Sequence, residues 1–303
     1  MVRHESTGLA LGSRDKLRAA LLSGVAGYVD AAGLLSVVAL FPAHITGELV
    51  TEAVAISSGQ RAAGPSRWWM LPVFVLAVAL SAVVARLERR AGRPPLPTLL
   101  LLVALGLFAF AASGVVSWAQ PGAPVNQVTQ LGTYCAVAAM GFQNALMREA
   151  LSGSAPTTFM TGNLTQVVIE LVEHGFALKS PPGIMSDVAR SVSRARLRTA
   201  AIAVGSFLVS AAIGAWLTHS VGALGATLPA LLVGGLSYQA YRERRGKRAE
   251  AVNQIGMRRP TPIARPLNKH NRAESGTRFK AVRPVASEPV TDDFTPEERK
   301  TGS

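Results

Sequence analysis

Long stretches without a charged side chain run through the first 241 residues. No Asp, Glu, Lys or Arg occurs over residues 68–85, 94–147 or 199–241, and the apolar stretch 17–41 contains Asp30. An α-helix rises 1.5 Å per residue, so about 20 residues cross a hydrocarbon core of about 30 Å. The two longest stretches therefore hold two spans each. The pattern predicts an all-α transmembrane helix bundle of six spans, at residues 17–41, 68–86, 96–118, 128–149, 199–217 and 221–241.

The composition favours a membrane protein over a soluble domain, because 49% of the residues are hydrophobic and only 16% are charged. The stretch 17–41 is longer than the apolar region of a signal peptide, about 7–15 residues, so we predict that it is a retained first span. A single cysteine, Cys135, excludes a disulfide scaffold and a cysteine-based zinc site. The sequence has no recognisable phosphate-binding loop, metal-ligand cluster or nucleophile triad, so neither an enzyme nor a cofactor is expected.

Basic residues give the predicted orientation, because cytoplasmic loops of membrane proteins are enriched in Lys and Arg. The basic clusters lie at 3–18, 86–93, 190–198 and 242–248. Six spans with both termini in the cytoplasm place all four clusters on that side. The loops left outside, near 119–127 and 218–220, contain no Lys or Arg.

Two apolar-rich segments, 42–56 and 156–172, are left over by this assignment. If either one alone crossed the membrane, every later basic cluster would change sides. We therefore predict two short re-entrant or amphipathic helices. An eight-span bundle, in which both segments cross, is the second choice because it would place the cluster 86–93 outside.

These two segments belong to an internal repeat. In the first half Gly27-Tyr28-Val29-Asp30-Ala31 precedes Ile45-Thr46-Gly47-Glu48-Leu49, and in the second half Gly141-Phe142-Gln143-Asn144-Ala145 precedes Met160-Thr161-Gly162-Asn163-Leu164. Each half then has the same order of span, Thr-Gly segment, span and span. Three spans per half would make the halves inverted copies, as in many secondary transporters. The motifs are short, so a chance similarity is the alternative.

The same motifs, with Met140 before the second Gly and Thr165 after Asn163-Leu164, resemble the YoaK-like family of bacterial inner-membrane proteins. The resemblance covers about residues 17–241. In that family the first Thr-Gly is usually followed by Asn, whereas this chain has Glu48. The resemblance implies a multi-pass bacterial inner-membrane protein and brings no established activity.

Asp30 is the first candidate for a solute- or ion-binding residue. An ionised carboxylate inside a span costs about 2.5–3.5 kcal/mol on insertion scales, so it usually faces a cavity or a partner. Asp30 is thus predicted either to bind a proton or cation or to lock helix packing through a hydrogen bond. Asn144 is its counterpart in the second half, and it could equally join two helices.

The Thr-Gly segments supply the other candidates, because Thr and Asn cap helices well and Gly lets a ligand approach the backbone. They are predicted to line one cavity at the interface of the repeats, or else to act only as caps and packing sites. Glu48 could bind a cation or relay protons, or it could share a solvated face with Glu52. The candidates in these segments are Thr46, Gly47, Glu48, Thr161, Gly162, Asn163 and Thr165.

The domain plan follows from these elements. Residues 1–16 form a cytoplasmic segment, 17–241 the transmembrane domain, with repeats 17–118 and 128–241, and 242–303 a basic cytoplasmic tail. The tail is rich in Pro and polar residues and is expected to be disordered, with its basic start near anionic lipid headgroups. Nucleic-acid binding is not expected, because no aromatic stacking pattern accompanies the charge.

The leading function is a secondary transporter or permease for a small solute, with alternating access between the halves. The alternative is a non-transporting membrane protein that binds a lipid or a protein partner. Substrate, coupling ion and oligomeric state do not follow from the sequence.

Overall fold

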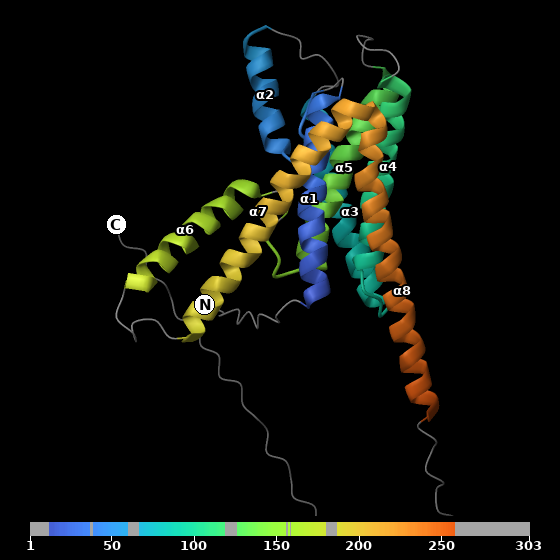
Figure 1. Ribbon diagram of the computed structural model, residues 1–303. Helices are drawn as coiled ribbons and strands as arrows, with labels where there is room; N and C mark the ends of the chain where they lie inside the picture. The colour runs from blue at the N-terminus through green and yellow to red at the C-terminus, as the bar shows by residue number, and fades with distance from the viewer. Residues whose placement is uncertain are drawn as a thin grey trace, which may run out of the picture. The chain divides into compact units, whose positions relative to one another are not determined.

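The computed structural model describes residues 12–36, 39–59, 67–118, 126–155, 157, 159–179 and 187–257. Within these residues all regular structure is helical, as the sequence predicts (Figure 1). The helices are α1 (Ser13–Leu35), α2 (Ile45–Ser57), η1 (Arg67–Trp69), α3 (Met70–Arg90), α4 (Leu96–Trp118), α5 (Gln127–Glu149), α6 (Met160–Lys179), α7 (Asp187–Val221), η2 (Gly222–Ala226) and α8 (Thr227–Met257).

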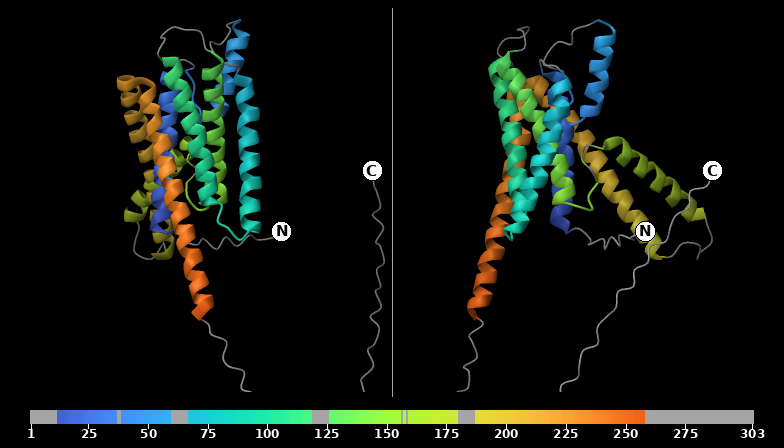
Figure 2. Two further views of the ribbon diagram at one scale, coloured as in Figure 1. Left: turned by 90° about the vertical axis from the view of Figure 1, so that its right-hand side faces the viewer. Right: turned by 180° about the vertical axis from the view of Figure 1, so that it is seen from behind.

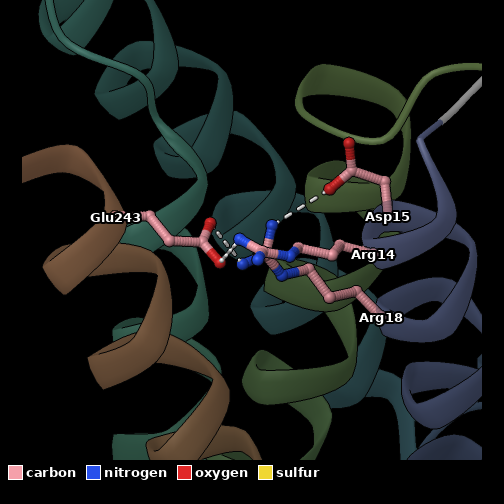
Figure 3. A network of polar contacts seen from close by, with 4 residues as sticks. All are labelled: Arg14, Asp15, Arg18 and Glu243. Atoms are coloured by element: carbon pink, nitrogen blue, oxygen red, sulfur yellow. Dashed lines mark hydrogen bonds and ion pairs between the residues drawn. The ribbon is translucent and has the colours of Figure 1, made fainter. Parts of the chain in front are cut away.

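Ion pairs tie the helices together at one end of the bundle. Arg18 near the start of α1 pairs with Glu243 of α8 at 2.7 Å, and Arg14 pairs with the same carboxylate at 3.3 Å (Figure 3). Arg244 of α8 pairs with Glu88 near the end of α3 at 3.4 Å. The start of α1 therefore lies beside the end of α3 and the charged part of α8, and α1 and α3 run in opposite directions.

The end of α5 joins this same end, because Arg89 pairs with Glu149. The start of α7 lies there too, because Lys16 and Arg194 line one groove. Residues from all four basic clusters are thus gathered at one end of the bundle. The views in Figure 2 show the long helices running back and forth from this end.

Glycines bring α1 and α7 into close contact. A Cβ at Gly27 would lie 2.3 Å from the carbonyl oxygen of Phe207, and one at Gly24 would lie 2.5 Å from Ser210 Oγ. Only glycine fits so close to another backbone. Ser23 adds a hydrogen bond, donating to the carbonyl of Ala203 at 2.7 Å. Higher residue numbers on α1 meet higher numbers on α7, so the two helices run parallel.

A second glycine crossing joins α3 and α5. A Cβ at Gly141 would lie 3.0 Å from the carbonyl oxygen of Phe74 and 2.9 Å from Ala77 Cβ. Further along, Met70 packs against Val137 in a buried cluster. Since Arg89 also meets Glu149, this pair of helices is parallel as well. The two crossings pack each half of the chain against the other half.

Three helical stretches of the described residues are long and apolar enough to cross a membrane: Arg67–Arg90, Leu96–Val115 and Arg190–Glu250, the last of which contains both α7 and α8. Their outer faces carry exposed large apolar side chains, such as Leu76 at 69% and Leu208 at 60% exposure. Such surfaces would be unstable in water, so these helices indicate a membrane protein.

Helices α1 and α5 do not appear among those stretches, although both were predicted as spans. They are the interior helices: every residue from Ser23 to Asp30 of α1 is buried, and about half of α5 is buried, including Ala139 to Gly141. A helix surrounded by protein does not need an apolar surface for lipid. Their lower hydropathy is therefore compatible with an interior position.

Several predicted boundaries are wrong. The first span was expected to reach residue 41, but α1 ends at Leu35, where the chain turns back. The fifth was expected to start at 199, but α7 starts at Asp187. The tail was expected to lack structure from residue 242, but α8 continues to Met257, and Glu243 and Arg244 in this part of the helix form ion pairs. The predictions for residues 1–11 and 258–303 lie outside the described residues.

We predict that Gly27→Ala destabilises the protein by about 1–3 kcal/mol, because the new methyl group overlaps the backbone of α7. Gly205→Ala is the matched control, since a Cβ there meets nothing within 4 Å. It should leave stability unchanged or raise it slightly through helix propensity. Thermal unfolding in detergent, followed by tryptophan fluorescence, measures both, and equal midpoints would contradict the close crossing.

Candidate functional site

The chain folds back on itself directly after α1. Ser36 donates its backbone N–H to the carbonyl of Gly33 at 3.2 Å, and Leu40 donates to the same carbonyl at 3.2 Å. A Cβ at Gly33 would lie 2.6 Å from the oxygen of Leu40 and 2.7 Å from Pro42 Cδ. This close approach requires glycine, and it brings residues 41–44 against the end of α1.

Asp30, on α1, stabilises this turn through two contacts. Its side chain accepts a hydrogen bond from the backbone N–H of Ala43 at 2.7 Å, and its second oxygen contacts Nδ1 of His44. The side chain of Asp30 is 5% exposed, whereas that of His44 is 38% exposed. A buried carboxylate is thus linked to the surface through one imidazole.

Glu48, on α2, stabilises the same turn. It accepts a hydrogen bond from the backbone N–H of Phe41 at 2.8 Å and forms an ion pair with Arg67 at 2.7 Å. Arg67 also donates to the carbonyl of Ala39 at 3.2 Å. We call Asp30, His44, Glu48 and Arg67 the turn cluster. The sequence did not identify Arg67 as a candidate residue, because Arg67 lies outside the repeated motifs.

The two glutamates of α2 do not form a solvated face, so the prediction that Glu48 shares such a face with Glu52 is wrong. Glu48 is 3% exposed and Glu52, one turn later, is 7% exposed. Oε2 of Glu52 has no hydrogen-bond partner among the described residues. Thr46 and Gly47, in the same helix, are exposed.

Gln143 forms a second buried polar site in the other half. Its Nε2 donates to the carbonyl of Leu22 at 2.9 Å and to Thr157 Oγ1 at 3.1 Å. Both Gln143 and Thr157 are completely buried. The repeated motif predicted the neighbouring Asn144 instead, and this residue is only half-buried. The presence of Gln143 inside an uncharged stretch was a signal that could have identified it.

The second Thr-Gly segment is more open. Thr161 and Thr165 are exposed, and Thr165 donates to the carbonyl of Thr161 at 2.8 Å. Asn163 is buried, at 5% exposure. A Cβ at Gly162 would overlap the ring of Phe159. Gly162 therefore packs against Phe159, three residues earlier in the same segment.

The structure does not bring the two Thr-Gly segments into one cavity. Helix α2 packs against α3 and η1, whereas α6 packs against α7, and Figure 1 shows them at separate places. The two buried polar sites are apart as well. Gln143 lies at the level of Leu22, and Asp30 is eight residues further along α1, a rise of about 12 Å.

Two cavities open at the basic end of the bundle. One, of about 630 Å³, lies between α1, α6 and α7 and is lined by Lys16, His174, Arg194, Arg198, Ile202 and Ala203 among others. We call it the basic groove. The other, of about 1190 Å³, lies between α4 and α8 near Arg93 and Tyr241. Neither is lined by Asp30 or Gly162.

Comparison with known proteins places the chain in a family. Residues 18–238 match the family described as "Protein of unknown function (DUF1275)". The chain belongs to this family. No curated protein and no solved structure matches it. The matched range agrees with the range of the resemblance stated above, about residues 17–241, and the family brings no activity with it.

Stability is expected to depend on pH through His44. The hydrogen bond to Asp30 raises the pKa of His44 above its usual value of 6.5, although burial opposes this shift. The stabilising contribution is therefore complete below about pH 6.5 and is lost as the pH rises through the raised pKa. We predict that the unfolding temperature falls over this window in the native protein and falls less in His44→Gln.

His219→Gln, at the end of α7, is the control for this pH series. It should retain the full pH dependence of the native protein. Thermal unfolding in buffers from about pH 5.5 to about pH 9 covers the window. The same slope in His44→Gln as in the native protein would show that protonation of His44 does not cause the pH dependence.

Proposed function

We propose that the protein is a six-span secondary transporter for a small solute, with a proton bound and released at the Asp30–His44 pair. One observation carries the proposal: a buried carboxylate on an interior helix is joined to an imidazole that reaches the surface. Ionisable groups inside membrane helices are rare and usually functional. A group that changes its charge in this position can alter the packing around it.

The order and the lengths of the helices support six spans. Helices α1, α3, α4, α5, α7 and α8 follow one another as long helices, and α2 and α6 are the shorter helices between them. The basic residues meet at one end, as expected of a cytoplasmic face. The inferred location is the bacterial inner membrane, with both termini in the cytoplasm.

Matching contacts support two inverted repeats. Gly27 and Gly141 occupy the same place in the repeated motif, and each lies against the carbonyl oxygen of a phenylalanine, Phe207 or Phe74. The helices after those that carry these phenylalanines, α4 and α8, both have Leu-Pro in their first turn, at Leu96 and Leu228. The α1–α7 pair and the α5–α3 pair would then be equivalent.

The turn cluster offers a physical route from protonation to movement. The ring of His44 packs edge-on against the ring of Phe207, with 5.9 Å between centroids. The carbonyl of Phe207 is also the contact point of Gly27. Protonation of the His44–Asp30 pair therefore acts on the crossing between α1 and α7, where one half would rock against the other.

Flux in vesicles tests the proposal. Proteoliposomes that enclose a pH-sensitive dye are challenged with a panel of amino acids, carboxylates, amines and polyols. We expect at least one solute to drive proton movement in the native protein. Asp30→Asn should reduce that signal to the level of protein-free vesicles, because the amide can accept the Ala43 hydrogen bond but cannot bind a proton at neutral pH.

Glu149→Gln is the matched control for this experiment, because it makes the same chemical change in the Arg89 ion pair at the basic end. It should retain flux. Both variants must remain folded during the assay, which a cooperative thermal unfolding transition well above the assay temperature would show. Full flux in Asp30→Asn would mean that the Asp30–His44 pair has a structural role only. The absence of any solute-driven signal in the native protein would contradict proton-coupled transport.

Cysteine labelling tests the orientation. In a Cys135→Ser background, we predict that Ser58→Cys after α2 reacts with an impermeant maleimide on intact cells. Ala91→Cys after α3 should react only once the membrane is permeabilised. Both positions are exposed, so reactivity reports the side of the membrane. The reverse pattern would contradict the proposed topology.

A further inference from the structure

The basic groove is not used by the proposed transport mechanism, although it is a well-formed site. Its walls are the start of α1, the segment after α5, α6 and the first half of α7. It has a volume of about 630 Å³. The residues that line it include Lys16, Arg194 and Arg198, together with His174, and no carboxylate is among its described lining residues.

These three cations differ from several other basic residues at this end. Arg18, Arg89 and Arg244 are each paired with a glutamate. Among the described residues, no carboxylate pairs with Lys16, Arg194 or Arg198. Of the two acids of α6, Glu170 is buried and accepts hydrogen bonds from Gln166 and Ser193, and Glu173 is exposed and is not among the lining residues. The groove therefore carries uncompensated positive charge.

Charge and apolar surface are separated along the groove. Arg194 and Arg198 lie one turn apart on α7, and the charge-free stretch of the chain begins directly after Arg198. Ile202 and Ala203 line the groove on that apolar side, with Ala19 and Ala20 of α1 facing them. A ligand that fits both parts has an anionic head and an apolar body.

The groove is also open along its length. Helix α6 packs against α7 and makes no comparable contact with α1 among the described residues. Large apolar side chains of α6, such as Leu164, Val168 and Leu171, are exposed. A membrane lipid could enter sideways and place its chains beside them.

We propose that the basic groove binds one anionic phospholipid. Its phosphate lies against Arg194, Arg198 and Lys16, and its acyl chains follow Ile202, Ala203 and the apolar side chains of α6. Basic pockets between helices at the cytoplasmic side recognise such headgroups. The lining of the groove favours a lipid over a soluble anion, because a small polar ion would leave the apolar residues Ile202 and Ala203 uncovered. This inference does not depend on transport.

Native mass spectrometry of the full-length protein in detergent tests the site. Phosphatidylglycerol or phosphatidylcholine is titrated, and bound adducts are counted. We expect one phosphatidylglycerol to bind more tightly than phosphatidylcholine. Each Lys or Arg near an anionic lipid changes affinity by about fivefold, so Arg194→Gln with Arg198→Gln should weaken binding by about thirtyfold.

Two further variants separate the groove from general surface charge. Arg86→Gln with Arg196→Gln removes the same charge from exposed positions that do not line the groove, and it should bind phosphatidylglycerol normally. Ala195→Phe keeps the charge but fills the groove, and it should lose the adduct. Ala195 is exposed, so this change leaves the packed interior intact.

Three outcomes would overturn the proposal. Equal losses in the groove and control pairs would mean a diffuse electrostatic surface. Displacement of phosphatidylglycerol by inorganic phosphate at equal concentration would mean a site for soluble anions. A dimer that Ala195→Phe abolishes would mean that a second copy of the chain fills the groove. Lipid binding is read without any flux assay, so its failure and the failure of transport are distinguishable.

Discussion

Close contact between backbones at glycine is the constraint on which the structure depends. In a bilayer, lipid chains are as apolar as leucine, so helices associate through van der Waals packing and hydrogen bonds more than through the hydrophobic effect. Gly27 against Phe207 and Gly141 against Phe74 provide that contact. Because each crossing joins a helix of the first half to one of the second, the halves hold each other in place and leave α1 and α5 in the interior.

The turn after α1 shows how buried charge is made compatible with this packing. Two carboxylates of one short region, Asp30 and Glu48, each hold a backbone N–H of the turn and one basic side chain. Burial of an unpaired charge would cost several kcal/mol, whereas a paired and hydrogen-bonded one is tolerated. These contacts account for a structural role of Asp30, and the proposed proton exchange would use in addition the partly exposed imidazole of His44.

The sequence predicted the helices well, because charge-free length reports a property that each helix has by itself. It predicted their ends less well. The end of α1 is set by contacts of Gly33 with Leu40 and Pro42, which no periodicity reveals. The choice of Asn144 over Gln143 failed for a related reason: adjacent helical residues point about 100° apart, and a motif does not say which one faces a neighbouring helix.

The two Thr-Gly segments differ at one position of the motif, and the helices α2 and α6 that contain them pack against different partners. At the place of Glu48 the second segment has Asn163, which cannot form an ion pair of the kind that Glu48 forms with Arg67. Helix α2 is thus held by that pair beside α3, while α6 stays with α7 and leaves the basic groove open. On the proposed inverted repeat, this exchange of Glu for Asn gives the segment at one face of the membrane a charged anchor that its counterpart at the other face lacks.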